Sequence, residues 1–203
     1  MIKPCTGLSP EKTAELAYQA AVGGVDIIKD DELVANPPHC PLIERVKAVM
    51  PAIQNADRIK GEKTLFAFNI TDRADRIKEN ALKALEAGAN CLMLNYATVG
   101  LDAARMITAD PEIDVPILGH SDYVGASTAC EWCGTSTKLM NAKLPRLAGL
   151  DMLIALSPNG TFPMLMDTFQ HCGSSMTLTM GNLHPTFAIP GGSTTHGHLV
   201  SLL

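Results

Sequence analysis

Short, mostly apolar runs without alternating polar residues recur along the whole chain, and this feature constrains its fold more than any other. The runs lie at 25–29, 64–70, 91–95, 115–119, 151–156 and 186–190. Strands that are apolar throughout are covered on both faces, which is typical of a parallel sheet. Amphipathic helical segments separate the runs, and the first begins at Ser9-Pro10-Glu11 and ends at Gly23-Gly24. Repeated strand–helix units predict an α/β fold, either a (β/α)8 barrel or a doubly wound sheet.

Polar residues at the ends of the predicted strands favour the barrel. Almost every run is followed by side chains capable of chemistry, such as those of Asn69, Asn95 and His120. In a barrel all strand ends meet at one face, where active sites are built, whereas in an open sheet they would spread along an edge. With a further short strand near 2–5, seven strands are expected, one fewer than a closed barrel of eight requires. We therefore expect an incomplete (β/α)8 TIM barrel with about seven strands.

The charge balance and the lengths of the apolar runs exclude several classes of partner. The formal net charge is −5 and Lys and Arg do not cluster, which argues against a nucleic-acid partner. No apolar run approaches the roughly 20 residues that a membrane span needs, and the first residues lack the apolar core of a signal peptide. The six cysteines are scattered, which is typical of reduced thiols. These observations predict a cytoplasmic protein with neither a membrane nor a nucleic-acid partner.

The segment Lys29-Asp30-Asp31-Glu32 places one amine and three carboxylates at the end of the first apolar run. Side chains alternate along a strand, so Lys29 and Asp31 should point the same way, and Glu32 joins them if the chain turns there. Two carboxylates form an oxygen-rich site that suits Mg²⁺. The lysine could act as a charge partner or a base, or its neutral amine could take up CO₂ to become a carbamate, a third anionic oxygen ligand. The alternative interpretation is a solvated run of charges.

A series of short motifs runs through the chain in order. They are Lys3-Pro4 with Gly7-Leu8-Ser9, the segment from Gly23 to Glu32, Phe68-Asn69-Ile70-Thr71, the segment from Lys143 to Gly149, and Pro190-Gly191-Gly192. Together they resemble the large subunit of ribulose bisphosphate carboxylase (RuBisCO) and its non-carboxylating relatives. The resemblance covers essentially the whole chain. The last two motifs look more like the RuBisCO-like proteins than like the true carboxylases.

The resemblance implies a metal site. Lys29 matches the family's lysine that is carbamylated by CO₂, and Asp31 and Glu32 match its two carboxylate ligands of Mg²⁺. Asp30 would then point away from the ion and serve the structure. The cofactor expected from the resemblance is therefore Mg²⁺, held partly by carbamylated Lys29.

Further site residues are also implied by the resemblance. Lys3 matches the family's catalytic lysine, and a nearby dication would push it towards the neutral form that a base needs. His120 matches a catalytic, substrate-contacting histidine, and Asn69 is expected to support the metal shell and the bound substrate. Gly191 and Gly192 match a phosphate-binding turn, where the missing Cβ lets backbone N–H groups approach an anion. The alternatives are an exposed lysine, a structural histidine, an asparagine that caps a turn, and an ordinary Gly-Gly turn.

Two departures from the carboxylases affect the expected chemistry. Ser121 stands where the carboxylases have an arginine after the strand-end histidine, so one phosphate anchor is missing. The segment 157–161 contains no lysine, whereas the matching loop of the carboxylases carries one that stabilises the CO₂ adduct. The sequence therefore predicts that CO₂ is not fixed. Enolisation requires only the metal and a base, and the residues for both are present.

Two other patterns are given structural interpretations. Cys130 and Cys133 have the spacing of half a zinc site or a redox pair, but no second pair follows at ligand spacing, so we interpret them as a coincidence. His196 and His198 could touch a phosphate or a metal, and we interpret them as residues that begin a helix.

We expect residues 1–203 to form the C-terminal barrel domain of a RuBisCO-like protein, without the family's N-terminal α+β domain and last strand–helix unit. The parent protein is expected to be a homodimeric enzyme that enolises or isomerises a phosphorylated ketose or diketone, as in methionine salvage. One alternative is a decarboxylase of a phosphorylated 3-oxo sugar acid. The other is a barrel fragment without catalytic activity.

Overall fold

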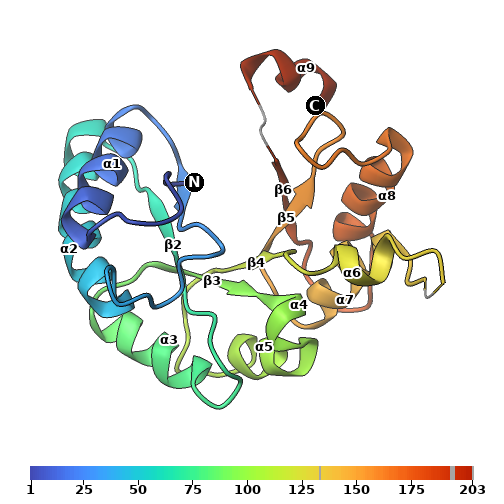
Figure 1. Cartoon of the computed structure of the whole chain (residues 1–203), viewed down its shortest axis with the longest axis horizontal. Coiled ribbons are helices and arrows are strands. Elements are labelled where there is room, and N and C mark those ends of the chain that lie inside the picture. Colours follow the sequence, from blue (N-terminus) through green and yellow to red (C-terminus); the bar gives the residue numbers. More distant parts are fainter. Residues whose placement is uncertain (133, 193–194, 203) are drawn as a thin grey trace. The chain divides into compact units, whose positions relative to one another are not determined.

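The computed structural model describes residues 1–132, 134–192 and 195–202. These residues form two compact units. The first contains Met1–Asn95 and Ala109–Ile117, and the second contains Tyr96–Thr108 and Leu118–Leu203. The candidate metal ligands all lie in the first unit, which is coloured blue to green at the start of the chain (Figure 1).

The first unit is built from alternating helices and parallel strands. In chain order these are α1 (Pro10–Val22), β1 (Ile27–Lys29), α2 (Leu42–Lys60), β2 (Leu65–Asn69), α3 (Ile77–Glu86) and β3 (Cys91–Asn95). β2 pairs in parallel with both β1 and β3, with Ile28 opposite Phe66 and Phe68 opposite Leu92. Because parallel strands end at the same edge, the polar residues that follow β1, β2 and β3 lie together.

Local sequence signals account for the helix ends of this unit. The Ser9 hydroxyl accepts the N–H of Lys12, and Pro10 occupies the first turn of α1. Gly61 ends α2 in the left-handed conformation, with φ of 82°, which a residue with a side chain adopts only at a cost. The bounds of α1 agree with the start and end expected from the sequence.

The core of the first unit lies between its strands and the faces of its helices. The rings of Phe66 and Phe68 are fully buried on β2, with centroids 4.5 Å apart. α1 packs along α2 (Figure 1), and the fully buried Ala17 and Ala21 of α1 allow this close approach. Burial of one such phenylalanine contributes about 1.5–3 kcal/mol to the free energy of unfolding.

The second unit continues the same alternation. Its elements are α4 (Tyr96–Val99), α5 (Leu101–Thr108), β4 (Ile117–His120, whose first residue belongs to the first unit), α6 (Gly125–Thr128), the π-helix η1 (Leu139–Lys143), α7 (Leu144–Leu147), β5 (Met152–Leu156), α8 (Met166–Thr177), β6 (Phe187–Gly191), the 3-10 helix η2 (His196–His198) and α9 (Leu199–Leu202). β5 pairs in parallel with both β4 and β6.

A buried arginine stabilises one side of the second unit. Arg146 of α7 is 2% exposed, and its guanidinium donates only to backbone carbonyls in the described residues. The acceptors are the carbonyls of Ser175, Leu178, Leu183 and His184. Arg146 therefore ties the end of α8 to the segment that leads into β6.

The strand expected near 2–5 is not formed, and this expectation was wrong. In the described part of the chain six strands are present, at the positions of the other six apolar runs. The Ile2 N–H donates to the Lys29 carbonyl at 3.1 Å, so the segment lies beside β1. Pro4 has no N–H for a ladder, which explains why pairing does not continue. None of the helices in the described residues is both long and apolar enough to cross a membrane.

Candidate metal centre

Four charged residues follow one another where β1 ends, and they differ in burial. Asp30 and Asp31 are each 2% exposed, whereas Glu32 is half-buried. The chain turns directly after Asp31, because the Val34 N–H donates to the Asp31 carbonyl at 3.0 Å. The turn brings Glu32 back towards the amine of Lys29, as expected from the sequence.

Lys29 is a largely buried amine. Its Nζ donates to Glu32 Oε2 at 3.2 Å and to the Asp30 carbonyl at 2.8 Å. Burial lowers the pKa of Lys29, and the negative charge of Glu32 opposes this shift only in part. The neutral amine, the form that reacts with CO₂, is therefore more accessible here than on an exposed lysine.

Asp31 is a buried carboxylate with two strong donors. Lys3 Nζ lies 2.6 Å from Asp31 Oδ2, and the Leu33 N–H donates to Asp31 Oδ1 at 3.0 Å. Burial acts to raise the pKa of Asp31, but these hydrogen bonds outweigh it, so the pKa is lowered. The carboxylate is therefore ionised at neutral pH, as a metal ligand must be.

The same contact acts on Lys3 in the opposite direction. The hydrogen bond to Asp31 raises the pKa of Lys3, and the weaker effect of burial does not reverse this shift. The sequence-based expectation was a lowered pKa, but that expectation assumed a dication beside the amine. In this structure Lys3 is an ammonium group that neutralises Asp31.

Two asparagines support the turn that carries Asp31 and Glu32. Asn69, the last residue of β2, is fully buried, and its Nδ2 donates to the carbonyls of Asp31 at 3.3 Å and Glu32 at 3.0 Å. Its Oδ1 accepts the N–H of Thr71. Asn95, the last residue of β3, donates from Nδ2 to the same Glu32 carbonyl at 3.0 Å. The expectation that Asn69 supports the site thus has a geometric basis in backbone contacts.

Asn95 and Arg45 are supporting residues that the sequence interpretation did not assign. An asparagine at the end of each of two neighbouring strands was the available signal for Asn95. Arg45 belongs to the first turn of α2 and bonds to Asp30, with Nε 3.0 Å from Asp30 Oδ2. Nothing in the sequence pattern distinguishes it from an ordinary helix arginine, because the contact depends on the tertiary fold.

The donor set suits a hard dication only if Lys29 contributes a further oxygen. In the described ranges, no three His, Cys, Asp or Glu side chains are grouped as the ligands of an ion. Asp31 and Glu32 supply two carboxylates, and Lys29 is held beside Glu32. A carbamate on Lys29 would complete three anionic oxygen ligands, the type that Mg²⁺ prefers.

The remaining predicted site residues belong to the second unit. His120 ends β4, and its Nδ1 accepts the N–H of Asp122 at 3.2 Å. Gly191 ends β6, and Gly192 follows with φ of 93°, a conformation that favours glycine. The structure therefore gathers Lys3, Lys29, Asp31, Glu32 and Asn69 in one unit, and the other three in the second.

A closely packed turn adjoins Gly191 and Gly192. The Ser157 N–H donates to the Gly191 carbonyl at 3.0 Å, and a Cβ added to Gly160 would lie 3.2 Å from the carbonyl carbon of Gly192. The Ser157 hydroxyl is buried and has no hydrogen-bond partner in the described part of the chain. Ser157 is thus a further polar group near the predicted phosphate-binding turn.

The two other sequence patterns have different outcomes. Cys133 lies outside the described residues. The interpretation of the Cys130–Cys133 spacing as a coincidence therefore stays a prediction. His196–His198 form a single helical turn before α9, which confirms that these residues begin a helix. The His198 Nδ1 accepts the N–H of Thr195 at 3.1 Å.

The family model for the catalytic domain of the ribulose bisphosphate carboxylase large chain matches residues 1–161. The chain belongs to this family. A ribulose bisphosphate carboxylase-like protein of Archaeoglobus fulgidus is 43% identical over 95% of this chain and 44% of its own length. A 2,3-diketo-5-methylthiopentyl-1-phosphate enolase of Bacillus cytotoxicus is 34% identical over 90% of this chain and 44% of its own length. The chain spans less than half the length of these RuBisCO-like relatives.

A solved structure extends the RuBisCO-family match to the fold. The crystal structure of a rubisco-like protein from Alicyclobacillus acidocaldarius superimposes with a TM-score of 0.90 over 98% of this chain and 50% of that chain, at 28% identity. The predicted fold class, an incomplete α/β barrel of the RuBisCO type, is therefore confirmed. The motif-based resemblance to RuBisCO-like proteins is confirmed as well.

Proposed function

We propose that the RuBisCO-like protein represented by this chain catalyses Mg²⁺-dependent enolisation or isomerisation of a phosphorylated ketose or diketone. The proposal rests on the arrangement at the end of β1, where the largely buried Lys29 bonds to Glu32 and the exposed Lys3 bonds to Asp31. Enolisation needs a positive charge that polarises a carbonyl and a base that takes the adjacent proton. The enolase named among the relatives supports a diketone phosphate of methionine salvage as the substrate.

In this proposal Mg²⁺ is held by Asp31, Glu32 and a carbamate on Lys29. When bound, the ion supplies the positive charge that polarises the substrate carbonyl. The lowered pKa of Lys29 supports the carbamate, because only the neutral amine attacks CO₂. The amine nitrogen forms the new bond to carbon and loses one proton to solvent, which leaves an anionic carbamate.

Lys3 is proposed as the base. Its ammonium group is held by Asp31, and this contact raises the pKa of Lys3. If Asp31 served as a metal ligand instead, Lys3 would lose this partner and would lie near a positive charge, and both changes would lower its pKa. The neutral amine can then accept the proton from the carbon next to the carbonyl. In this proposal, binding of the metal ion by Asp31 and formation of the neutral amine on Lys3 are coupled.

The second unit is proposed to bind the substrate. We assign substrate contact to His120 and phosphate binding to Gly191 and Gly192, where the absence of side chains lets an anion approach the backbone. The buried Ser157 hydroxyl beside this turn can donate a further hydrogen bond. Asn69 is assigned to support the ligand-bearing turn and, through it, the bound substrate.

The proposed reaction stops at enolisation and isomerisation and does not extend to CO₂ fixation. The segment 157–161 contains no lysine, so no cation from this segment can stabilise a new carboxylate. Ser121 provides no positive charge for a phosphate. A homodimer of the longer parent protein and a location in the cytoplasm stay predictions from the sequence.

Exchange of substrate hydrogen with solvent deuterium tests the proposal directly. The exchange at the carbon next to the carbonyl is followed by NMR with 2,3-diketo-5-methylthiopentyl 1-phosphate, Mg²⁺ and bicarbonate. We expect exchange with the wild-type chain and its loss in Lys3→Met, with metal binding retained. Exchange that continues in Lys3→Met would exclude Lys3 as the base, and exchange that is independent of Mg²⁺ would exclude the metal mechanism.

A further inference from the structure

Arg45 is a fully buried arginine at a position that is electrostatically unfavourable for its own helix. It is 0% exposed and lies in the first turn of α2, where the positive end of the helix dipole repels a cation. Burying a guanidinium group also costs hydration. The contacts that offset these costs therefore indicate what Arg45 contributes.

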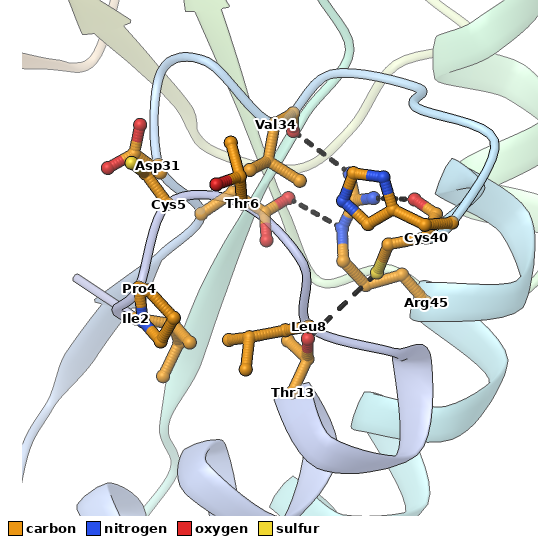
Figure 2. Close-up of a pocket in the computed structure, with 12 residues that line it drawn as sticks. Ile2, Pro4, Cys5, Thr6, Leu8, Thr13, Asp31, Val34, Cys40 and Arg45 are labelled. Atoms are coloured by element: carbon orange, nitrogen blue, oxygen red, sulfur yellow. Dashed lines mark hydrogen bonds and ion pairs between the residues drawn. The ribbon is translucent and has the colours of Figure 1, made fainter.

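Those contacts converge on the loop that carries the candidate metal ligands. We call residues 30–41, which connect β1 to α2, the ligand loop. Arg45 Nε donates to Asp30 Oδ2 at 3.0 Å, and Nη1 donates to the Cys40 carbonyl at 2.6 Å. Nη2 donates to the carbonyls of Val34 at 3.3 Å and Ala35 at 2.8 Å. Figure 2 shows the Arg45 side chain lying between Val34 and Cys40. One planar group thus holds the beginning, middle and end of the ligand loop.

Asp30 extends this network to the neighbouring strand. The Oδ2 atom that accepts from Arg45 also accepts the N–H of Asn69 at 2.9 Å, and the Asp30 N–H donates to the Ala67 carbonyl at 3.1 Å. Asp30 lies between Lys29 and Asp31 in the chain. Contacts that hold the backbone and side chain of Asp30 therefore also hold the backbone of Lys29 and Asp31 at the end of β1.

Apolar packing alone does not hold the ligand loop. A cavity of about 20 Å³ lies against it and is lined by Asp30, Asp31, Val34 and Arg45 among others (Figure 2). This volume accommodates roughly one water molecule. On this side the carbonyls of Val34, Ala35 and Cys40 are held by the guanidinium group of Arg45.

We propose that Arg45 and Asp30 form a positioning pair that holds Asp31 and Glu32 in the conformation that binds a metal ion. Neither residue touches the ion or the substrate. The inference rests on the proposed metal site. It attributes part of the affinity for the metal ion to the buried Arg45–Asp30 contact, which supports the loop that carries the ligands. A guanidinium group makes several hydrogen bonds in fixed directions, so lysine cannot replace Arg45.

The test compares two arginine-to-lysine variants of the whole chain. The probe is Mn²⁺ in bicarbonate buffer, with free Mn²⁺ measured by electron paramagnetic resonance. We expect Arg45→Lys to bind Mn²⁺ about 10–100-fold more weakly than wild type, as when partners behind metal ligands are removed. The matched control is Arg146→Lys, because Arg146 is equally buried and bonds to carbonyls of the second unit. It should lower the melting temperature and leave the Mn²⁺ affinity within about twofold of wild type.

A second variant covers the case in which Arg45→Lys does not fold. Asp30→Asn keeps an oxygen that can accept the Asn69 N–H but removes the charge that Arg45 binds. We expect Asp30→Asn to weaken Mn²⁺ binding in the same direction. Hydrogen exchange of the Leu33 amide, measured without metal, should accelerate in either folded variant but not in Arg146→Lys.

The outcomes separate this inference from the proposed function. Wild type that does not bind Mn²⁺ would overturn the metal site and this inference together. Wild type that binds, with a folded Arg45→Lys or Asp30→Asn of equal affinity, would overturn the positioning pair alone. An Arg146→Lys variant that loses affinity to the same extent would also overturn it, because general loss of stability would then explain the effect.

Discussion

Lys3 Nζ lies 2.6 Å from Asp31 Oδ2, and the two side chains differ sharply in exposure. The Lys3 side chain is 55% exposed and that of Asp31 is 1% exposed. The charge of a buried carboxylate is therefore balanced by a lysine that water can reach. The proposed metal site requires Asp31 to exchange its ammonium partner for a metal ion, and the exposure of Lys3 allows this amine to move into solvent without disturbing the core.

The lowered pKa of Asp31 predicts a specific dependence of stability on pH. A carboxyl group whose folded pKa lies below its unfolded value stabilises the fold above the unfolded pKa, and this contribution is lost as the pH falls through the folded pKa. In metal-free buffer, the free energy of unfolding of wild type should therefore exceed that of Asp31→Asn most clearly above about pH 4. The difference should shrink at lower pH.

Urea unfolding between about pH 3 and pH 6 measures this difference. Asp75→Asn serves as the control, because Asp75 pairs with Arg73 at an exposed position. Its effect should stay within about 0.5 kcal/mol. A difference between wild type and Asp31→Asn that does not change over this pH range would contradict the prediction.

Lys29 is predicted to form a carbamate more readily than exposed lysines. Its lowered pKa means that the neutral amine appears at lower pH than on an ordinary lysine. The occupancy of the carbamate on Lys29 should therefore begin to rise at a lower pH than on an exposed lysine. With ¹³C-labelled bicarbonate, NMR should show one carbamate signal that Lys29→Arg removes. Lys12→Arg, at a lysine that is 52% exposed, should leave the signal unchanged. A signal that survives in Lys29→Arg would place the modification elsewhere.

The sequence predicted the strands better than the contacts around the site. Mostly apolar runs marked β2 and β3, because strands buried on both faces need no polar alternation. The strand predicted near 2–5 is not formed, because Pro4 interrupts the hydrogen-bond ladder that the strand would need. Asp31 and Glu32 could be identified from their position after β1. The contacts of Arg45 and Asn95 with backbone carbonyls could not, because such contacts arise only once distant elements have packed together.

Asn69 is predicted to matter for stability as well as for the site. It is fully buried, and Asn69→Ala would leave the carbonyl of Asp31 and the N–H of Thr71 without this partner. We expect a loss of about 1–3 kcal/mol in the free energy of unfolding, the usual cost of a buried unsatisfied group. Asn55→Ala, at an exposed position of α2, should change it by less than about 0.5 kcal/mol. Equal effects of the two substitutions in urea unfolding would refute this expectation.

The absence of a lysine in the segment 157–161 predicts that ribulose bisphosphate is not carboxylated. Incubation of the protein with this substrate, Mg²⁺ and radiolabelled bicarbonate should give no acid-stable labelled product. A carboxylase of the same family serves as the positive control. Labelled product above the level of a boiled sample would show that another group stabilises the adduct.

The central claim is that Lys29, Asp31 and Glu32 bind a divalent metal ion, and a crystal structure with Mn²⁺ and bicarbonate tests it most directly. Anomalous scattering locates Mn²⁺ without reference to the protein density. We predict a single anomalous peak within about 2.5 Å of oxygens of Asp31 and Glu32, with additional density on Lys29 Nζ and with Lys3 released from Asp31. An ion bound elsewhere, with Lys3 still on Asp31 and unmodified Lys29 still on Glu32, would contradict the claim.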